Sequence, residues 1–446
     1  MRRVLANAWP LLVGMFLLQI GNGLQSTVLG IRGGLEGFDA TTMGVVMSGY
    51  FVGFLFGAQA TPAMLRRVGH VRTFAALVSL LSAALIVYAA AVHPVAWTAM
   101  RVLAGFCFSG IYVVAESWLN NQSTNATRGK ALSIYLVCQT VGIVLAQAIV
   151  PFGDPQGYDL FVLMTVAVSL ACAPILLTAS PAPVHERSRT LSIRDLFRIS
   201  PLGAVGMMLV GAICAGMFGM SAGWGSQRGL DAATISLVVS AIFVGSAVMQ
   251  FPIGYVSDRV DRRGLIVIVT FVGAGGALVM TLSGSSVIGI VAGAFVVGGM
   301  ANPLYSLLIA HTNDFMELDD MAAAAGGLML LNGVGSAATP FAIGWLMTLA
   351  GPAAFPIFLA VAFAMIGVYG LYRATVRPAT PADETLPYTA VAPTTSTAGY
   401  AAAQAVYADA AVAQAEAIDL EYADAVGAGG LDGWGDDARA RAGAEA

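Results

Sequence analysis

The amino-acid sequence predicts an all-helical membrane protein with twelve spanning helices in two six-helix bundles, followed by a disordered C-terminal tail. Hydrophobic residues make up 58% of the 446 positions and charged residues only 10%, whereas about 25% of a soluble globular domain is charged. Apolar runs of about twenty residues, the length that crosses a bilayer core, recur along the chain. Parts of the first half also return in the second half at a constant spacing.

The apolar runs define the expected helices. The first run is interpreted as a spanning helix because it is too long for a signal peptide and lacks a small-residue cleavage site after a short apolar core. The spans are expected at residues 9–29, 41–63, 71–92, 95–118, 129–151, 159–179, 202–224, 232–254, 264–283, 286–310, 324–349 and 353–372. They divide the chain into an N-terminal bundle (1–180), a cytoplasmic linker (181–201), a C-terminal bundle (202–377) and a tail (378–446). The linker is either flexible or contains a short amphipathic helix near residues 192–200.

A repeat relates the two sets of six spans. A shift of 192 residues aligns residues 38–53 with 230–245, and eight of the sixteen positions are identical. We interpret the repeat as a duplication because polar residues and glycines stay in register beyond this segment, at an offset of 193. The matched pairs are Asp39/Asp231, Ala40/Ala232, Thr42/Thr234, Val46/Val238, Ser48/Ser240, Phe51/Phe243, Val52/Val244, Gly53/Gly245, Gly105/Gly298, Tyr112/Tyr305, Asn120/Asn313 and Gly142/Gly335.

The distribution of charge predicts which ends of the helices face the cytoplasm. If the N-terminus is inside, sixteen Lys and Arg residues fall in inner loops and flanks and two in outer loops, as the positive-inside rule requires. Both termini are therefore expected in the cytoplasm. The tail holds eleven acidic residues and two arginines and has few large aliphatic residues, a composition typical of disorder.

One loop between two apolar runs is densely charged. In residues 254–263, Gly254 lets two helices approach closely, and Asp258 suits the positive N-terminal end of a neighbouring helix. The pattern G-x-x-x-D-R-x-x-R-R resembles the signature loop of the major facilitator superfamily. Asp261 departs from that pattern, since the family usually has glycine there. The charged residues of the loop are Asp258, Arg259, Asp261, Arg262 and Arg263.

The first copy of this loop is degraded. At the same offset of 192, Pro62 stands opposite Gly254, Arg66 opposite Asp258 and Arg67 opposite Arg259. The first loop has thus lost the glycine and the aspartate and kept basic residues, which are what membrane topology needs.

The resemblance implies a secondary transporter that alternates access by rocking one half against the other, with a substrate site between the halves. The segments ESWLN and RGKALS look like those of a bacterial group of carriers with poorly defined substrates, a resemblance that implies a location in the inner membrane of a bacterium. The expected partners are a small-molecule substrate, the lipid bilayer and protons; the chain is expected to act as a monomer, to bind no nucleic acid and to use no cofactor or metal. The rival classes are a sensor that signals through its acidic tail and a membrane-embedded enzyme, which would need a nucleophile or metal cluster that the spans do not show.

Two charged residues in the fourth span are candidates for function because charges inside a bilayer are costly. Arg101 and Gly105 resemble the R-x-x-x-G pattern of the family's fourth helix, where the arginine is associated with proton coupling or substrate handling; alternatively Arg101 tethers a loop or snorkels to the surface. Glu116 resembles an acidic residue that pairs with loop arginines when the cytoplasmic side is shut. It is otherwise a proton-carrying carboxylate or a solvated helix end.

Uncharged polar residues in the spans either bind the substrate or join helices, because their amides and hydroxyls can do both. The cavity is expected to be lined by spans 1, 4, 5, 7, 8, 10 and 11. Its candidate residues are Gln19, Asn22, Gln25, Ser26, Arg101, Tyr112, Gln139, Trp224, Gln250, Asn302, Tyr305 and Asn332. The candidate gating residues are Gly254, Asp258, Arg259, Arg262, Arg263, Arg66, Arg67, Arg72, Glu116 and Arg128.

Overall fold

A computed structural model describes residues 2–177, 193–316, 318–376 and 388–396, with residues 399, 403, 405 and 406. Within these residues there is no β-strand, and twelve helices are long and apolar enough to cross a membrane. The predicted all-helical class and number of spans are thus confirmed. Most of the predicted linker and most of the predicted tail lie outside the described residues.

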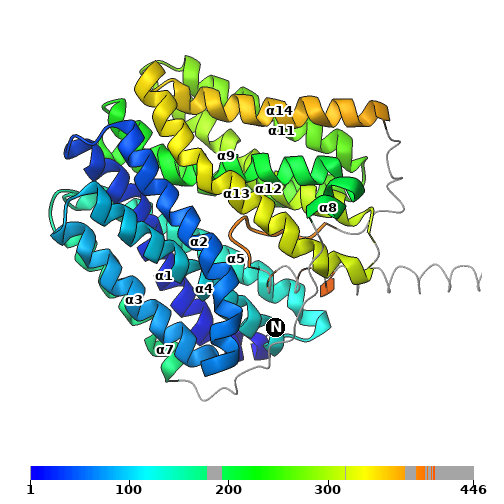
Figure 1. Ribbon diagram of the computed structural model, residues 1–446, viewed down its shortest axis with the longest axis horizontal. Helices are drawn as coiled ribbons and strands as arrows, with labels where there is room; N and C mark the ends of the chain where they lie inside the picture. Colours follow the sequence, from blue (N-terminus) through cyan, green and yellow to red (C-terminus); the bar gives the residue numbers. More distant parts are fainter. Residues whose placement is uncertain are drawn as a thin grey trace, which may run out of the picture.

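The first six spans form one bundle, coloured blue to cyan-green in Figure 1. α1 is longer than predicted, so Arg32 belongs to this helix instead of a loop and its Nε lies 3.2 Å from Glu36 Oε1. The sixth span breaks at Cys172, just before Pro174, which has no N–H to continue the helix. The helices are α1 (Arg2–Leu35), α2 (Ala40–Val68), α3 (His70–Ala90), α4 (Pro94–Gln122), α5 (Asn125–Ile149), the 3₁₀ turn η1 (Val150–Phe152), α6 (Asp159–Ala171) and α7 (Ala173–Leu176).

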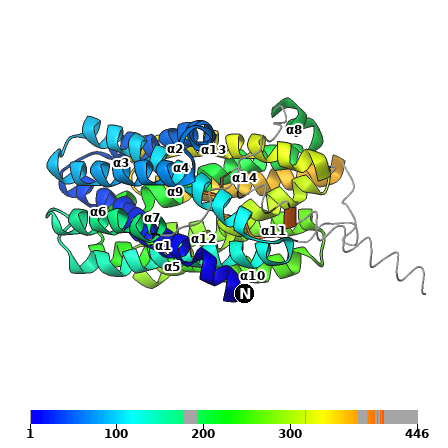
Figure 2. The same cartoon turned by 90° about the horizontal axis from the view of Figure 1, so that it is seen from below.

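The second six spans form the other bundle, and a short helix precedes them. This helix, α8, buries Leu196 and exposes Arg194 and Arg198, so the described part of the linker is the amphipathic helix that was one of the two alternatives. Figure 2 shows α8 at the periphery of the molecule. The helices are α8 (Ile193–Ile199), α9 (Pro201–Gln227), α10 (Ala232–Ser257), α11 (Arg262–Leu282), α12 (Val287–Asn313), α13 (Leu318–Ala350) and α14 (Ala354–Val376).

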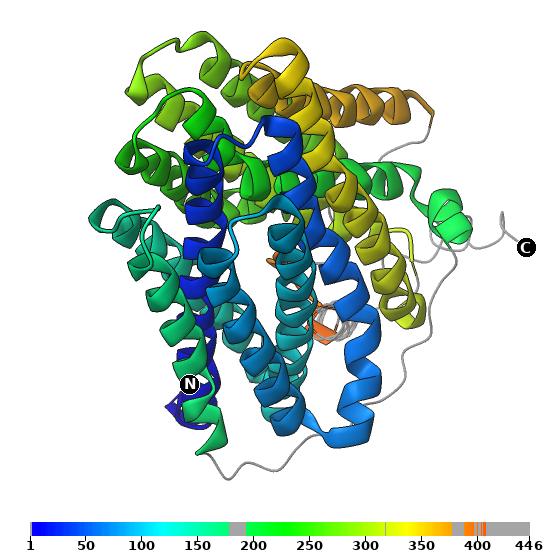
Figure 3. The same cartoon turned by 60° about the vertical axis from the view of Figure 1, so that its left-hand side comes forward.

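The two bundles meet at one end and diverge at the other (Figures 1 and 3). Because the spans alternate in direction, the diverging end holds the N-terminus and the loops around Arg66 and Arg259. We call this the arginine end and the other the opposite end. The described tail segment 388–396 lies between the bundles at the arginine end.

The duplicated aspartate and threonine are helix caps. Asp39 Oδ1 accepts a hydrogen bond from the backbone N–H of Thr42 at 3.1 Å, at the start of α2. Asp231 Oδ1 accepts one from Thr234 at the same distance, at the start of α10. Each carboxylate satisfies an N–H that the first turn of a helix leaves unpaired. The repeat in the sequence therefore records a local structural requirement that both bundles share.

The duplicated glycines mark close helix crossings. A side chain at Gly53 would overlap the backbone carbonyl of Val102, where α2 crosses α4, and one at Gly245 would overlap that of Phe295, where α10 crosses α12. Gly105 and Gly298 complete the two crossings from the other helix. Small residues allow such backbone contact between membrane helices. These crossings make each bundle a tightly packed unit.

We expect Gly298→Ala to lower the melting temperature of the detergent-solubilised protein, because the new Cβ meets the carbonyl of Ile242 and overpacking costs about 1–3 kcal/mol. Gly275→Ala is the matched control: this glycine of α11 has no atom within 4 Å of an added Cβ. Both substitutions gain similar helix propensity, so their difference reports the clash. Equal melting temperatures would contradict the close crossing.

Candidate functional site: a cavity between the two bundles

A cavity of about 260 Å³ lies between the bundles. α1, α2, α4 and α5 line it from the first bundle, and α9, α10 and α12 from the second, and tail residues 390–394 also line it. The set of helices that line the cavity differs from the predicted set in two helices. α2 contributes Tyr50 and Phe51, and none of the described residues of α13, the eleventh span, lines the cavity.

The opposite end of the cavity is sealed by direct contact between the bundles. Thr41 Oγ1 of α2 lies 2.8 Å from Thr348 Oγ1 of α13. Gly44 lies so close to the carbonyl of Pro340 that an added Cβ would stand 2.5 Å from its oxygen. A solute in the cavity cannot leave this way unless α2 and α13 separate.

At the arginine end the gap between the bundles is filled by part of the chain in which disorder was predicted. The backbone N–H of Val391 donates to Ser306 Oγ, and the Ser306 hydroxyl donates to the carbonyl of Val391, both at 3.0 Å. The backbone N–H of Tyr388 donates to Asp258 Oδ1 at 2.6 Å. The described segment 388–396 is thus held by its backbone, with hydrogen bonds to the second bundle.

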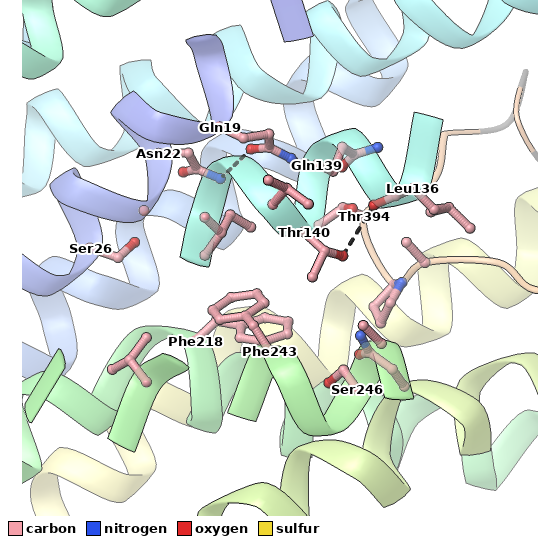
Figure 4. A pocket seen from close by; sticks show the side chains of 18 of the residues that line it. Gln19, Asn22, Ser26, Leu136, Gln139, Thr140, Phe218, Phe243, Ser246 and Thr394 are labelled. Atoms are coloured by element: carbon pink, nitrogen blue, oxygen red, sulfur yellow. Dashed lines mark hydrogen bonds between the residues drawn. The ribbon is translucent and has the colours of Figure 1, made fainter. Parts of the chain in front are cut away.

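Hydrogen-bonded side chains from three helices line the first-bundle wall (Figure 4). Gln19 Nε2 of α1 donates to Gln139 Oε1 of α5 at 2.7 Å. Tyr112 of α4 and Asn22 of α1 both donate to Gln19 Oε1, at 3.1 and 3.3 Å. Because these groups satisfy one another, they both join helices and present polar atoms to the cavity.

Arg101 of α4 also lines the cavity, and it is only 1% exposed. Its guanidinium carbon lies 4.8 Å from the centre of the Tyr50 ring, a cation–π contact. Its Nε and Nη1 have no hydrogen-bond partner. Arg101 does not reach the membrane surface, so the structure does not support the snorkelling alternative.

The second-bundle wall carries a pair of aromatic rings beside the polar residues Ser246, Gln250 and Asn302. Phe218 of α9 and Phe243 of α10 stack with ring centres 4.9 Å apart, and they face Gln19, Asn22 and Gln139 across the cavity (Figure 4). The sequence did not predict these residues, because aromatic side chains in an apolar helix do not stand out as polar ones do. One signal was present in the sequence: Phe51 and Phe243 are a matched pair of the repeat, and both line the cavity.

Most of the predicted cavity residues lie together, and four lie elsewhere. Gln25 is turned toward α3, where its Nε2 donates to Tyr88 Oη at 2.8 Å. Trp224 packs 5.3 Å from the Phe355 ring, and Tyr305 is wholly buried. Asn332 donates to the carbonyl of Met207 at 3.5 Å within the second bundle. Those that line the cavity are Gln19, Asn22, Ser26, Arg101, Tyr112, Gln139, Gln250 and Asn302.

Glu116 is buried and does not pair with the arginines proposed for it. Its Oε2 accepts hydrogen bonds from the backbone N–H and the hydroxyl of Ser396 at 2.7 and 2.6 Å. Arg66, Arg67 and Arg72 are exposed at the arginine end, and neither they nor Arg128 forms a salt bridge with any described residue. The bundles diverge at this end, so the arginines of α2 and α3 remain in solvent.

The charged loop is organised differently from the prediction. Asp261, not Asp258, caps a helix: it accepts hydrogen bonds from the N–H groups of Arg263 and Gly264 at the start of α11. Asp258 follows the end of α10 and binds Tyr388 of the tail. Gly254 provides the space for that tyrosine, because an added Cβ would stand 2.6 Å from its ring.

The remaining arginines of the loop hold the arginine end of the second bundle. Arg262 Nη1 lies 2.5 Å from Asp314 Oδ1 and forms a buried ion pair between α11 and the end of α12. Arg262 Nη2 also lies 4.0 Å from Asp258 Oδ1. Arg263 Nη1 donates to the carbonyl of Arg373 at 3.5 Å. Arg259 packs on the Tyr255 ring. These contacts lie within one bundle and its loop and do not cross between the two.

Two six-helix bundles with a cavity between them are the architecture expected of a membrane transporter. The family model of the Major Facilitator Superfamily matches residues 11–226 and 204–408, and the chain belongs to that superfamily. It is therefore a multi-pass membrane transporter and not an enzyme.

Known relatives and structures agree with this assignment. An uncharacterized MFS-type transporter, YcaD of Escherichia fergusonii, is 24% identical over 332 residues, which is 74% of this chain and 86% of that protein. The nucleoside transporter NupG has a similar structure, with a TM-score of 0.67, 13% identity, and 82% and 98% of the two chains covered. The human organic anion transporter MFSD10 has a TM-score of 0.57 and 15% identity, with 82% of this chain and 98% of that chain covered. At these identities the two structures establish the fold alone.

Proposed function

We propose that this chain is a secondary active transporter that moves a small solute across the cell membrane by alternating access. The observation that carries this proposal is the asymmetry of the cavity, which direct contact seals at the opposite end while the bundles diverge at the arginine end. Two tightly packed bundles can exchange these ends by rocking about the cavity. The structure corresponds to the state that faces the arginine end.

The arginine end faces the cytoplasm in this proposal. Sixteen Lys and Arg residues fall on that side of the spans and two on the other, and anionic lipid and the positive-inside rule favour that orientation. The inner membrane of a bacterium is the setting, as for the bacterial relative YcaD. One chain provides the whole cavity, so a monomer suffices for transport.

Transport is coupled to protons through Glu116. This carboxylate is 1% exposed and forms no salt bridge with any described residue. Two hydrogen bonds to its Oε2 come from Ser396 of the tail, and Tyr135 and the backbone of Gly399 also interact with the carboxylate. None of these groups carries a positive charge, so a proton is what neutralises the carboxylate when the tail is absent. It lies on the same helix as Arg101, which connects it to the cavity wall.

The alternating-access proposal predicts that a bond across the seal traps the protein. In a chain whose four cysteines are replaced, Thr41→Cys and Thr348→Cys should form a disulfide, since their hydroxyls lie 2.8 Å apart in different bundles. A third substitution, Ser26→Cys, reports access to the cavity. Its labelling by a membrane-impermeant maleimide from the opposite side of the membrane should stop on oxidation and recover on reduction.

The matched control is the pair Ser82→Cys and Ser169→Cys, whose hydroxyls lie 2.7 Å apart within the first bundle. A disulfide there should leave labelling of Ser26→Cys unchanged. Labelling that continues through the locked seal would overturn alternating access.

Proton coupling predicts that Glu116→Gln separates exchange from accumulation. Glutamine mimics the permanently protonated acid, so the variant should exchange solute across proteoliposome membranes but lose uphill movement driven by a pH gradient. Glu36→Gln, a partly exposed carboxylate at the opposite end that pairs with Arg32, should behave as the wild type. Gradient-driven accumulation that survives in Glu116→Gln would show that the proton site is elsewhere.

A further inference from the structure

The cavity has a positive charge that no acidic residue balances. Arg101 is the one charged side chain among the described residues that line it, and it takes part in none of the salt bridges of the described chain. Glu116 lies fifteen positions further along α4, which is about 22 Å at ~1.5 Å per residue. The guanidinium therefore lies in the wall of the cavity without an acidic partner, and a solute reaches its N–H groups when the side chains around it move.

The hydrogen-bonding capacity of this guanidinium is also unfilled. The Tyr50 ring covers a face of the group at 4.8 Å, and the N–H groups of two of its three nitrogens, Nε and Nη1, have no acceptor. Burying an ion without an acceptor costs several kcal/mol, and proteins retain such groups where a ligand completes them. The amides of Gln19 and Gln139, which line the same cavity, bond to each other.

The facing wall defines the rest of the solute. Phe218 and Phe243 offer a stacked aromatic surface on the second bundle, opposite the polar wall of the first (Figure 4). A ligand that spans the cavity therefore has one anionic end and one apolar side. It would contact both bundles, as a solute that controls their rocking must.

We propose that the transported solute is a small organic anion with an apolar or aromatic body. Its anionic oxygens accept hydrogen bonds from Arg101, and its body packs against Phe218 and Phe243. This inference rests on the proposed transport function and names its substrate class.

The test is a thermal-shift measurement on the full-length purified protein with matched pairs of probes: benzoate and benzamide, phenylacetate and phenylacetamide, hexanoate and hexanamide. Anions should raise the melting temperature and their neutral amides should not. In Arg101→Gln the dissociation constant of the best anion should rise about 10- to 100-fold, the loss expected for hydrogen bonds to a charged group. Arg198→Gln, at an exposed arginine of α8 outside the cavity, should keep the response.

A second measurement separates binding from structural support. Without ligand, Arg101→Gln should melt at or above the wild-type temperature, because the substitution removes an unpaired buried charge. The proposal is overturned if no anion is preferred to its amide, or if Arg101→Gln melts lower and keeps the anion response. The disulfide test of alternating access uses no solute, so it can succeed while this proposal fails.

A different observation concerns the gap at the arginine end. The segment 388–396 is bound there by both bundles: Glu116 of the first holds Ser396, and Ser306 and Asp258 of the second hold Val391 and Tyr388. The Tyr388 hydroxyl accepts a further hydrogen bond from Gln250 at 2.8 Å. The segment contains a turn at residues 393–394 and is held by backbone hydrogen bonds and by the side chains of Tyr388 and Ser396. Proteins bind peptides through the same combination of main-chain hydrogen bonds and side-chain anchors.

We infer that the gap at the arginine end is a peptide-binding groove whose occupant is this chain's own segment 388–396. Residues 390–394 form part of the cavity wall, so the bound segment obstructs the path of a solute between the cavity and that end. It also links the bundles while they are apart. The segment has to leave before the arginine end can close, and it therefore slows the transport cycle.

Cysteine pairs in the full-length, otherwise cysteine-free chain test this groove. Ser306→Cys with Val391→Cys should form a disulfide in membranes at least about tenfold faster than Ser306→Cys with Ala440→Cys, because a merely tethered tail gives both thiols similar effective concentrations. In a separate chain, Tyr388→Ala should speed maleimide labelling of Ser26→Cys from the arginine side several-fold. Equal crosslinking rates, or unchanged labelling in Tyr388→Ala, would overturn the inference.

Discussion

The close backbone contact of α2 with α4 is the constraint from which the cavity is built. Gly105 brings α4 against the carbonyl of Tyr50, and Arg101 lies one turn away on the same face of α4. The Tyr50 ring is thereby placed 4.8 Å from the guanidinium. The spacing of arginine and glycine thus has a direct physical reason: the glycine sets how closely the helices approach, and the arginine occupies the side of the crossing that faces the cavity.

Features that depend on local chemistry could be predicted from the sequence. The matched Asp39/Asp231 and Thr42/Thr234 pairs are caps, which require a particular side chain two or three positions before a helical N–H. The matched glycines are crossings, where any larger side chain meets backbone. Such requirements act on one position at a time and survive duplication, so they remain visible in a single sequence.

Features that depend on helix rotation and on distant segments could not be predicted. Gln25 and Ser26 are neighbours separated by ~100° around α1, and only the packing of α3 decides that Gln25 turns to Tyr88 while Ser26 faces the cavity. The choice of Asp261 over Asp258 as the cap depends on where α11 begins. No periodicity could show that Ser396 reaches Glu116, because 280 positions separate them.

Equivalent positions in the two bundles carry different side chains and make different contacts. The second holds its arginine end with the buried ion pair of Arg262 and Asp314. At the offsets of the repeat, these positions correspond to His70 and Asn121 in the first bundle, where His70 and Asn121 instead contact the side chain and the carbonyl of Ser117, respectively. The first bundle, however, holds the cavity wall with Arg101, and the second holds the wall with the pair of aromatic rings. The first bundle thus supplies the cavity arginine, and the second is held together by a buried ion pair. A ligand that contacts both bundles binds best at one relative position of the two.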